Sequence, residues 1–238
     1  MSIFRIRQTI PLISNSAHPN FIEVENESIF SVLTHAPGPE GSLDLSDTML
    51  KESASGDLFG LSQNAGMGWN PKEMLGPQYL ILNSHGGIRN QDGSPVALGY
   101  HTGHWEIGLL AEKAAKEFKK MGAVPFAAHV SDPCDGRSQG TTAMFDSLAY
   151  RNDASTVLRR LARSLPTARG IMGVATCDKS MPAMMMALAS LGELPVILVP
   201  GGVTLSATEG EDAGKAQSIG IRYSHGAVSY THLRAHET

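Results

Sequence analysis

Short apolar runs alternate with amphipathic segments along most of this 238-residue chain. Four runs have the length and composition of buried strands: residues 78–82, 124–130, 171–175 and 195–199. Three further segments place apolar side chains at helical spacing: residues 104–120, 153–164 and 182–191. Strands that alternate with helices of this length predict βαβ units. The chain is therefore expected to have an α/β fold, with a parallel sheet flanked by helices.

The predicted helices have recognisable inner and outer faces. In segment 104–120, five apolar residues are expected to point inward: Ile107, Leu110, Ala111, Ala114 and Phe118. The lysines between Lys113 and Lys120 alternate with Glu117 and apolar residues, which is typical of a solvated helix face. In segment 153–164, the residues expected to face the core are Val157, Leu158 and Leu161. Both helices should therefore pack one side against the sheet.

The N-terminal quarter of the chain lacks this periodicity. Residues 1–55 are rich in Pro, Ser, Asn and Glu, which predicts an irregular N-terminal arm. The segment Gly56–Gly68 contains several glycines among short polar side chains and is expected to form a shaped loop.

Composition and charge restrict the partners and the compartment. The formal net charge is -4, from 19 basic and 23 acidic residues, so nucleic acid is not expected as a partner. We identify no signal peptide and no transmembrane stretch, and we expect no membrane association. Two cysteines are too few for a disulfide framework. A reducing compartment, and therefore a cytoplasmic location, is the default expectation.

Both cysteines are followed directly by an aspartate, at Cys134-Asp135 and at Cys177-Asp178, and Lys179 comes next in the second case. These steps lie in loops that follow predicted strands, which we expect to be neighbours in the sheet. Ligands of parallel sheets bind beyond the carboxyl ends of the strands. Because thiolates suit iron and carboxylates suit magnesium, the pattern predicts a site that holds both kinds of metal.

The same residues are also compatible with plainer roles. A single loop cysteine is often structural, Asp178 could cap the following helix, and Lys179 could be exposed. Each of three histidines, taken alone, is most simply a satisfied polar group: His101, His104 and His129. The pair Gly201-Gly202 could cradle an anion. The pattern alone therefore leaves two alternatives open, a non-catalytic α/β domain that binds a small anion and a magnesium-only lyase.

Longer motifs resemble one family. Cys177–Pro182 and Pro195–Gly202 resemble the IlvD/Edd family of dihydroxy-acid and sugar-acid dehydratases. Further segments resemble its xylonate dehydratase branch: Gly99–Trp105, Ser131–Gly140, Phe145–Asp153 and Gly210–Lys215. The resemblance runs from about residue 28 to about residue 227. It implies that the α/β domain is the N-terminal domain of such a dehydratase.

The resemblance also implies a reaction and its cofactors. The family removes water from a sugar acid, here expected to be an aldonate such as D-xylonate, and yields a 2-keto-3-deoxy acid. It uses an iron–sulfur cluster, expected to be of the 2Fe–2S type, together with Mg²⁺. By position, Cys177 resembles a cluster ligand, whereas Asp135 and Asp178 resemble magnesium ligands. Lys179 resembles a catalytic lysine that is carboxylated in the family and binds magnesium as an anion.

Two departures from the family pattern affect these expectations. Many members have a cluster cysteine near the position of His104, where this chain has no thiol, so we assign that role to Cys134. The family's third cluster cysteine, its C-terminal domain and the serine thought to act as base have no counterpart in this sequence. We therefore expect an N-terminal fragment that is inactive alone and a homo-oligomer when complete.

The expected domain limits follow from the sequence patterns and from the extent of the family resemblance. The arm covers residues 1–55, the incomplete cluster- and metal-binding α/β domain covers residues 56–227, and the tail covers residues 228–238. The tail has no apolar periodicity and resembles translated adapter sequence, so it is expected to be non-native.

Overall fold

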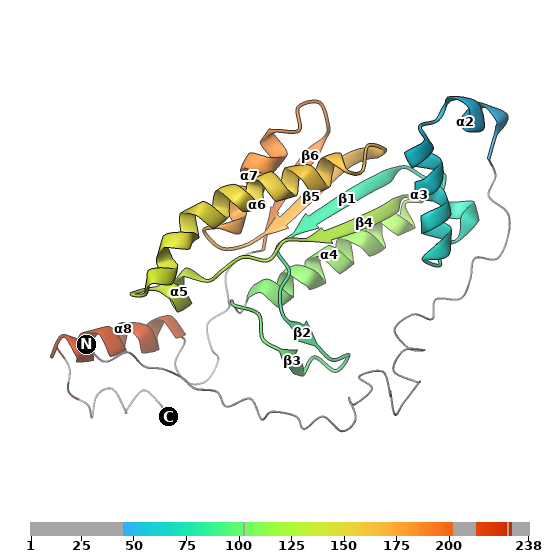
Figure 1. Cartoon of the computed structure of the whole chain (residues 1–238). Helices are drawn as coiled ribbons and strands as arrows, with labels where there is room; N and C mark the ends of the chain where they lie inside the picture. Colours follow the sequence, from blue (N-terminus) through green and yellow to red (C-terminus); the bar gives the residue numbers. More distant parts are fainter. Residues whose placement is uncertain (1–44, 102, 202–212, 228, 230–238) are drawn as a thin grey trace, which may run out of the picture. The chain divides into compact units, whose positions relative to one another are not determined.

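The structure of the chain, a computed structural model, describes residues 45–101, 103–201, 213–227 and 229 (Figure 1). The chain divides into two compact units, Met1–Pro71 and Lys72–Thr238. The first unit contains α2 (Asp47–Glu52) and α3 (Ser55–Gly66), so the described end of the predicted arm includes a helix. The rest of the arm and nearly all of the predicted tail lie outside the described residues. The domain limits at residues 55 and 227 stay predictions.

Helix α3 occupies the segment that was expected to be a loop, so that expectation is wrong. Leu61, Asn64 and Ala65 are buried on one face of α3. Asp57 lies in its first turn, where a negative charge interacts favourably with the helix dipole. Each glycine inside a helix costs only about 1 kcal/mol relative to alanine. Burial of this apolar face therefore outweighs the glycines from which the loop was predicted.

The second unit contains a four-stranded parallel sheet, as predicted. Its strands are β1 (Gln78–Asn83), β4 (Val124–His129), β5 (Ala168–Ala175) and β6 (Val196–Pro200). The long helices of this unit are α4 (Gly103–Lys120), α6 (Asp146–Arg163), α7 (Ser180–Ala189) and α8 (Ala213–Ser224). The short elements are η1 (Pro71–Glu73), β2 (Ile88–Arg89), β3 (Pro95–Ala97), α5 (Asp135–Ser138) and η2 (Thr142–Phe145). Strands β2 and β3 form a separate antiparallel pair.

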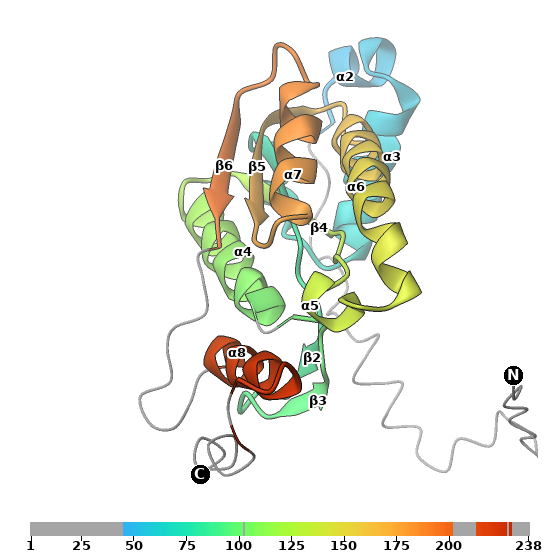
Figure 2. The same cartoon turned by 90° about the vertical axis from the view of Figure 1, so that its left-hand side faces the viewer.

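The strand order is β4-β1-β5-β6, so the two strands that precede the Cys-Asp steps are not neighbours. This corrects the expectation that β4 and β5 lie side by side. The chain runs from β1 to β4 on one side and then crosses back over β1 to β5. Helix α4, in the first connection, covers one face of the sheet, and α6, in the second, covers the other (Figure 2). A reversal of this kind opens a crevice at the carboxyl ends of the strands.

Two apolar clusters hold the helices against the sheet. On one face, Leu80 and Leu82 of β1 belong to the same buried cluster as residues of α6 and α7, including Leu158 and Met184. On the other face, Ile81 packs with residues that include Ile107 of α4. Successive residues of a strand point to opposite faces, so β1 supplies both clusters. This explains why the sequence of β1 is a continuous apolar run and does not alternate between apolar and polar residues.

Helices α4 and α6 follow the sequence pattern closely but not completely. Residues Ile107 and Ala111 are buried as predicted, whereas Leu110 is 40% exposed. In α6, Leu158 is buried but Val157 is 43% exposed, so its inward orientation was predicted wrongly. Both errors concern residues adjacent to a buried position, where a helix turns by about 100° per residue. The buried faces predicted for the two helices were therefore slightly too wide.

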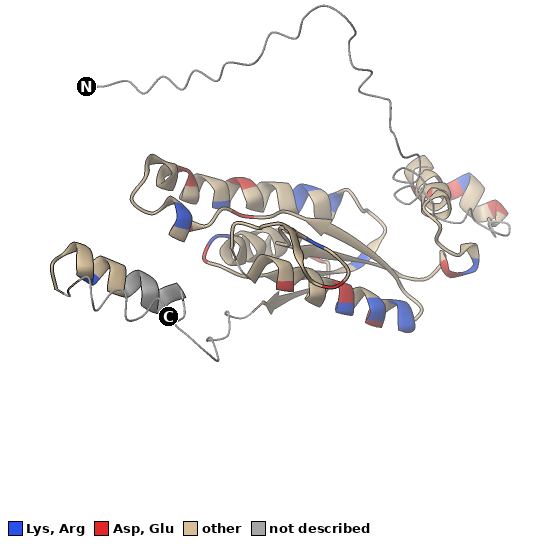
Figure 3. Ribbon diagram, turned by 90° about the horizontal axis from the view of Figure 1, so that it is seen from below, with Lys and Arg blue, Asp and Glu red and all other residues tan. Residues whose placement is uncertain are grey.

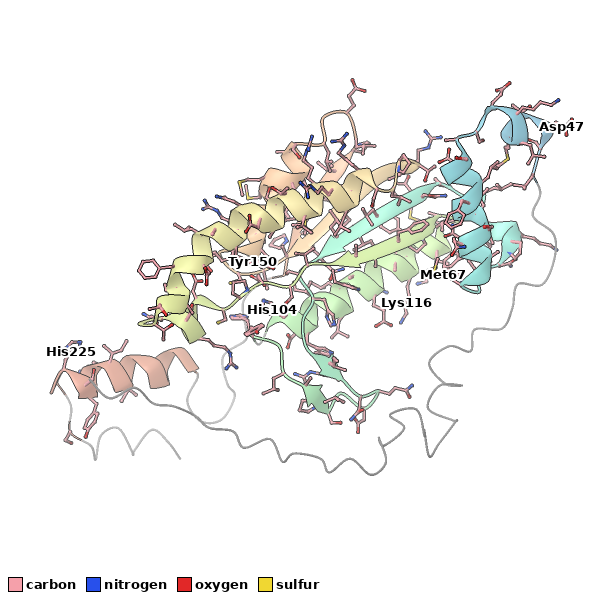
Figure 4. The ribbon with its side chains drawn as sticks, in the orientation of Figure 1. Asp47, Met67, His104, Lys116, Tyr150 and His225 are labelled. Carbon is pink, nitrogen blue, oxygen red and sulfur yellow. The ribbon has the colours of Figure 1, made fainter. Side chains whose placement is uncertain are left out.

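The lysine-rich side of α4 is a solvated face, as predicted. Lys113 and Lys120 form ion pairs with Glu117, and Lys116 pairs with Glu112. Figure 3 shows basic and acidic residues interleaved along the helices, and Figure 4 labels Lys116 on α4. Among the described helices, none has the combination of length and apolar character required to cross a bilayer.

We predict that Gly173→Ala destabilises the fold. Gly173 is a buried β5 residue, and an added Cβ would lie 2.6 Å from Cγ and 2.8 Å from Sδ of Met184 on α7. Overpacking of this kind costs about 1–3 kcal/mol of unfolding free energy, measurable by urea denaturation. Gly220→Ala in α8 is the matched control, because among the described residues no atom beyond its chain neighbours and its own helix backbone lies within 4 Å of the added Cβ. An equal effect of the two substitutions would contradict the packing described here.

Candidate functional site

Two carboxylates from different loops converge on the amine of Lys179. Asp135, the first residue of α5 after β4, lies 2.6 Å from Lys179 Nζ through Oδ2. Asp178, in the loop after β5, lies 2.6 Å from the same nitrogen through its own Oδ2. The Lys179 side chain is only 8% exposed, whereas that of Asp178 is 63% exposed. The centre is thus buried on the lysine side and open on the Asp178 side.

Asp135 is fixed by a second contact from α6. Ser147, which is buried near the start of that helix, donates a hydrogen bond from its hydroxyl to Asp135 Oδ1 at 2.6 Å. One oxygen of the carboxylate therefore faces Ser147, and the other faces the lysine amine. Ser147 lies inside the family-like segment Phe145–Asp153, but the sequence pattern gave it no role, because it lies 12 residues from Asp135 and before the predicted helix start.

The loop between β5 and α7 has an unusual backbone at Cys177. Its φ is +72°, and among the described residues it is the one non-glycine residue with a positive φ. Such a conformation costs about 1–3 kcal/mol and persists only where the surroundings enforce it. It allows Sγ of Cys177 to lie 3.1 Å from Oδ1 of Asp178. The loop therefore holds the thiol, a carboxylate and the amine within three residues.

Electrostatics at this centre follow from these contacts. Hydrogen bonds to Asp135 and Asp178 raise the pKa of Lys179 above its usual value, so the amine is a cation here. The hydrogen bond from Lys179 lowers the pKa of Asp178 to about 2. Burial, followed by the hydrogen bond to Asp178, raises the pKa of the Cys177 thiol to about 12. In this state the centre consists of two carboxylates, one ammonium group and a neutral thiol.

A second set of polar contacts lies deeper in the same two loops. Asp132, which is 2% exposed, places Oδ1 2.5 Å from Nε2 of His104 on α4. Its other oxygen accepts a hydrogen bond from the hydroxyl of Ser180 at 2.9 Å. Ser180 is the first residue of α7 and follows Lys179 directly. Neither Asp132 nor Ser180 has a role in the sequence-based predictions, although both fall near the predicted strand ends.

The three histidines considered above have separate partners. His104 pairs with Asp132, and Nδ1 of His129 lies 2.7 Å from Oδ1 of Asn83. Nδ1 of His101 accepts a hydrogen bond from the backbone of Gly103 at 3.1 Å. His101 and His129 therefore fit the interpretation as satisfied polar groups. His104 has a carboxylate close by, but neither of its ring nitrogens makes a hydrogen bond within the described residues. Figure 4 labels His104 at the start of α4.

The plainer roles for Asp178 and Lys179 do not apply. The N-cap position of α7 is Lys179, and no side chain caps this helix, so Asp178 is not a cap. Lys179 is buried, not exposed. Gly202 and residues 203–212 lie outside the described part of the chain, so the anion loop remains a prediction.

The centre fits a divalent cation by the chemistry of its donors. Two carboxylate oxygens already face a single positive group, and hard cations such as Mg²⁺ prefer carboxylate oxygens. Within the described residues, no three His, Cys, Asp or Glu side chains gather around one point. A metal here would therefore need a further ligand, and Lys179 is the nearest candidate if its positive charge is removed.

The two thiols fit iron–sulfur chemistry by type but not by number. Cys134 precedes α5 and Cys177 follows β5, and neither is in a disulfide. Clusters of the 2Fe–2S type commonly have four cysteine ligands. Since β1 lies between β4 and β5, the two loops must span two strand spacings, about 10 Å in total, to share a cluster.

A surface groove of about 280 Å³ lies elsewhere, near the amino ends of β5 and β6. Its lining includes Arg159 and Arg163 of α6 and Leu191 after α7. The candidate centre is at the opposite, carboxyl ends of the strands. The groove therefore does not contribute to it.

Comparison with known proteins identifies relatives of this chain. The family described as dihydroxy-acid/6-phosphogluconate dehydratase N-terminal matches residues 96–238, which include the predicted tail. D-xylonate dehydratase YagF of Escherichia coli (strain K12) is 60% identical over 205 residues, which are 86% of this chain and 31% of that protein. D-xylonate dehydratase YjhG of the same strain is 53% identical over 90% of this chain and 33% of that protein.

A more distant relative is the dihydroxy-acid dehydratase of Methanoregula boonei. It is 32% identical over 108 residues, which are 45% of this chain and 19% of that protein. The chain thus spans about a third of the length of the two D-xylonate dehydratases and less of this third protein. The D-xylonate dehydratases are more similar to it in both identity and extent.

We predict that Lys179→Met destabilises the chain in buffer without divalent cations. The substitution leaves two facing carboxylates without a counter-charge. Because Asp178 is largely exposed, the loss should be about 1–3 kcal/mol, below that for a fully buried pair. Lys116→Met is the control, since it removes an exposed lysine paired with Glu112 and should cost less than about 1 kcal/mol. Equal losses in urea denaturation would show that Lys179 does not balance these carboxylates.

We also predict that Cys177 reacts slowly with iodoacetamide. Thiolates are the reactive form, and a thiol whose pKa is about 12 is almost entirely neutral at pH 8. Peptide mass spectrometry should give an alkylation rate for Cys177 more than about tenfold below that in the urea-denatured chain. Asp178→Ala should raise the rate, because it removes a hydrogen bond and a charge that favour the neutral thiol. Equal rates in the native and denatured chains would contradict the assigned environment.

Proposed function

Because the chain belongs to the dihydroxy-acid/6-phosphogluconate dehydratase (IlvD/Edd) family, we propose that the complete protein is a sugar-acid dehydratase. Its proposed reaction removes water from an aldonate to give a 2-keto-3-deoxy acid. D-xylonate is the proposed substrate, because the two relatives at 60% and 53% identity are D-xylonate dehydratases. The observation that supports this function best is the convergence of Asp135 and Asp178 on one cation.

Three residues are proposed to hold Mg²⁺: Asp135, Asp178 and Lys179. The ammonium group of Lys179 lies between the two carboxylates and stands in for the positive charge of the metal. When bound, a divalent ion and an iron–sulfur cluster supply Lewis acids for the substrate carboxylate and for the departing hydroxyl. The protein residues keep the two carboxylates facing each other, and Ser147 orients Asp135 for this role.

Lys179 is proposed to change from a cation to an anion when the metal binds. An ammonium group next to a divalent ion would be repelled by it. Attack of the neutral amine on carbon dioxide forms an N–C bond and releases a proton, and the product is a negatively charged carbamate. The raised pKa of Lys179 opposes this step while both carboxylates hold the ammonium form. Loss of these two hydrogen bonds from Lys179 would therefore favour the carbamate.

Cys134 and Cys177 are proposed as ligands of an iron–sulfur cluster of the 2Fe–2S type. Their position on the two loops that carry Asp135 and Asp178 supports this assignment. The two thiols of this chain supply only part of a common ligand set, so the complete protein is proposed to supply the rest. For the same reason we propose that the 238-residue chain alone is inactive.

The test uses the protein at the full length of its D-xylonate dehydratase relatives, purified anaerobically. It should be brown, should absorb visible light, and should convert D-xylonate to the 2-keto-3-deoxy acid. Asp178→Asn should lower kcat/KM at least about 100-fold, because it weakens the electrostatic stabilisation of developing charge. Asp92→Asn, on the exposed turn between β2 and β3, is the matched control and should be active.

Other results of this test would indicate a different function for the protein. A colourless but Mg²⁺-dependent enzyme would be a magnesium-only lyase. A colourless protein that binds small anions without turnover would be a binding domain with structural cysteines. Either result would contradict the proposed function, and unchanged activity of Asp178→Asn would contradict the assigned centre.

A further inference from the structure

Two loops carry the proposed metal ligands: the loop after β4, with Asp135, and the loop after β5, with Asp178 and Lys179. We infer that Asp132 is a positioning residue that holds these two ligand-bearing loops at the spacing a divalent cation needs. It acts through His104 and Ser180, and it does not itself touch the metal or the substrate. This inference rests on the proposed function, since it concerns the geometry of the centre formed by Asp135, Asp178 and Lys179. No part of the sequence pattern or of the comparisons assigns such a role to Asp132.

The contacts of Asp132 join three separate elements. Its Oδ1 lies 2.5 Å from His104 Nε2 in the first turn of α4, and its Oδ2 accepts the Ser180 hydroxyl at 2.9 Å at the start of α7. All three side chains are buried, with exposures of 0%, 2% and 3% for His104, Asp132 and Ser180. Water cannot replace these contacts easily, and an unpaired carboxylate at this depth would be strongly unfavourable. These contacts therefore hold together the start of α4, the loop after β4 and the start of α7.

The positions of these residues along the chain connect them to the candidate ligands. Asp132 lies three residues before Asp135, and Ser180 follows Lys179 directly. The Ser180 hydroxyl also contacts the backbone carbonyl of Thr176, which precedes Cys177. A shift of Asp132 relative to Ser180 would consequently change the distance between the two ligand-bearing loops.

The two loops are thus linked at two levels. The outer link is the Lys179 ammonium group between Asp135 and Asp178. The inner link is Asp132 between His104 and Ser180. In the proposed function the outer link is lost whenever Lys179 becomes an anion. The inner link does not involve Lys179, so it can still hold the two loops at the separation that a cation requires.

Packing around the inner link leaves little room for adjustment. The backbone N–H of Gly86, after β1, donates to the carbonyl of His104 at 3.2 Å. A Cβ at Gly86 would lie 2.5 Å from Oγ of Ser131, the neighbour of Asp132, and 3.4 Å from Cβ of His104. The segment after β1, one of the two inner strands of the sheet, therefore lies directly against this network and restricts its movement.

The experiment measures binding of Mn²⁺, as a probe for divalent cations, to the 238-residue chain. Free Mn²⁺ is followed by electron paramagnetic resonance in buffer that contains bicarbonate. Two variants perturb the inner link. Asp132→Asn replaces one carboxylate oxygen by an NH₂ group and removes the charge beside His104, and Ser180→Ala removes the hydroxyl donor. Ser180→Thr retains a hydroxyl. Ser190→Ala is the matched control at the other end of α7, where the hydroxyl donates a hydrogen bond to the carbonyl of Ala187.

The inference predicts that Asp132→Asn and Ser180→Ala each weaken Mn²⁺ binding about 10- to 100-fold, as residues that orient metal ligands do. Ser180→Thr should restore most of the affinity, and Ser190→Ala should not change it. All affinities are measured well below each variant's unfolding temperature. A residue that served stability alone would lower that temperature and leave the Mn²⁺ affinity intact.

Asp135→Asn separates failure of this inference from failure of the proposed metal centre. In one outcome, Asp135→Asn abolishes Mn²⁺ binding while Asp132→Asn and Ser180→Ala bind Mn²⁺ like the unsubstituted chain. The positioning role of Asp132 is then wrong, and the proposed metal centre is supported. If Asp135→Asn binds like the unsubstituted chain, or if that chain binds no Mn²⁺, the proposed centre is wrong and the positioning role falls with it.

Discussion

Two carboxylates that face each other need a cation between them. In this chain the carboxylates belong to Asp135 and Asp178, and the cation is the ammonium group of Lys179. Because each comes from a loop with its own strand and helix, their meeting depends on the strand order, on the unusual backbone at Cys177 and on the buried contacts of Asp132 and Ser147. The centre is therefore a property of the whole α/β unit, not of one motif.

The position of β1 explains how the two loops reach a common centre. Since β1 lies between β4 and β5, the loops on either side must converge over its carboxyl end. Helix α4 begins at this end on one face and supplies His104, whereas α6 begins there on the other face and supplies Ser147. Successive strands are thus added to the sheet first on one side of β1 and then on the other, and this change gives the centre support from both faces of the sheet.

The sequence predicted the parallel sheet from apolar runs and helical spacing. Asp135, Asp178 and Lys179 were singled out by their places after two strands and by the family resemblance, and the structure brings their side chains together. Their role as metal ligands stays a prediction. The sequence did not predict that β1 separates β4 from β5, since strand order depends on the direction of crossover connections. It also gave no role to Asp132, Ser180 or Ser147, whose functions appear only when distant elements pack together. The same limit explains α3, where burial overrides the local preference of glycine.

The most direct measurement is a crystal structure of the full-length protein with bound Mn²⁺, examined by anomalous scattering. The account predicts an anomalous peak about 2.0–2.3 Å from oxygen atoms of Asp135 and Asp178, with Lys179 carboxylated and bound to the same ion. A peak elsewhere, with the unmodified Lys179 ammonium group still between the two carboxylates, would contradict the central claim that this cation position is the metal site.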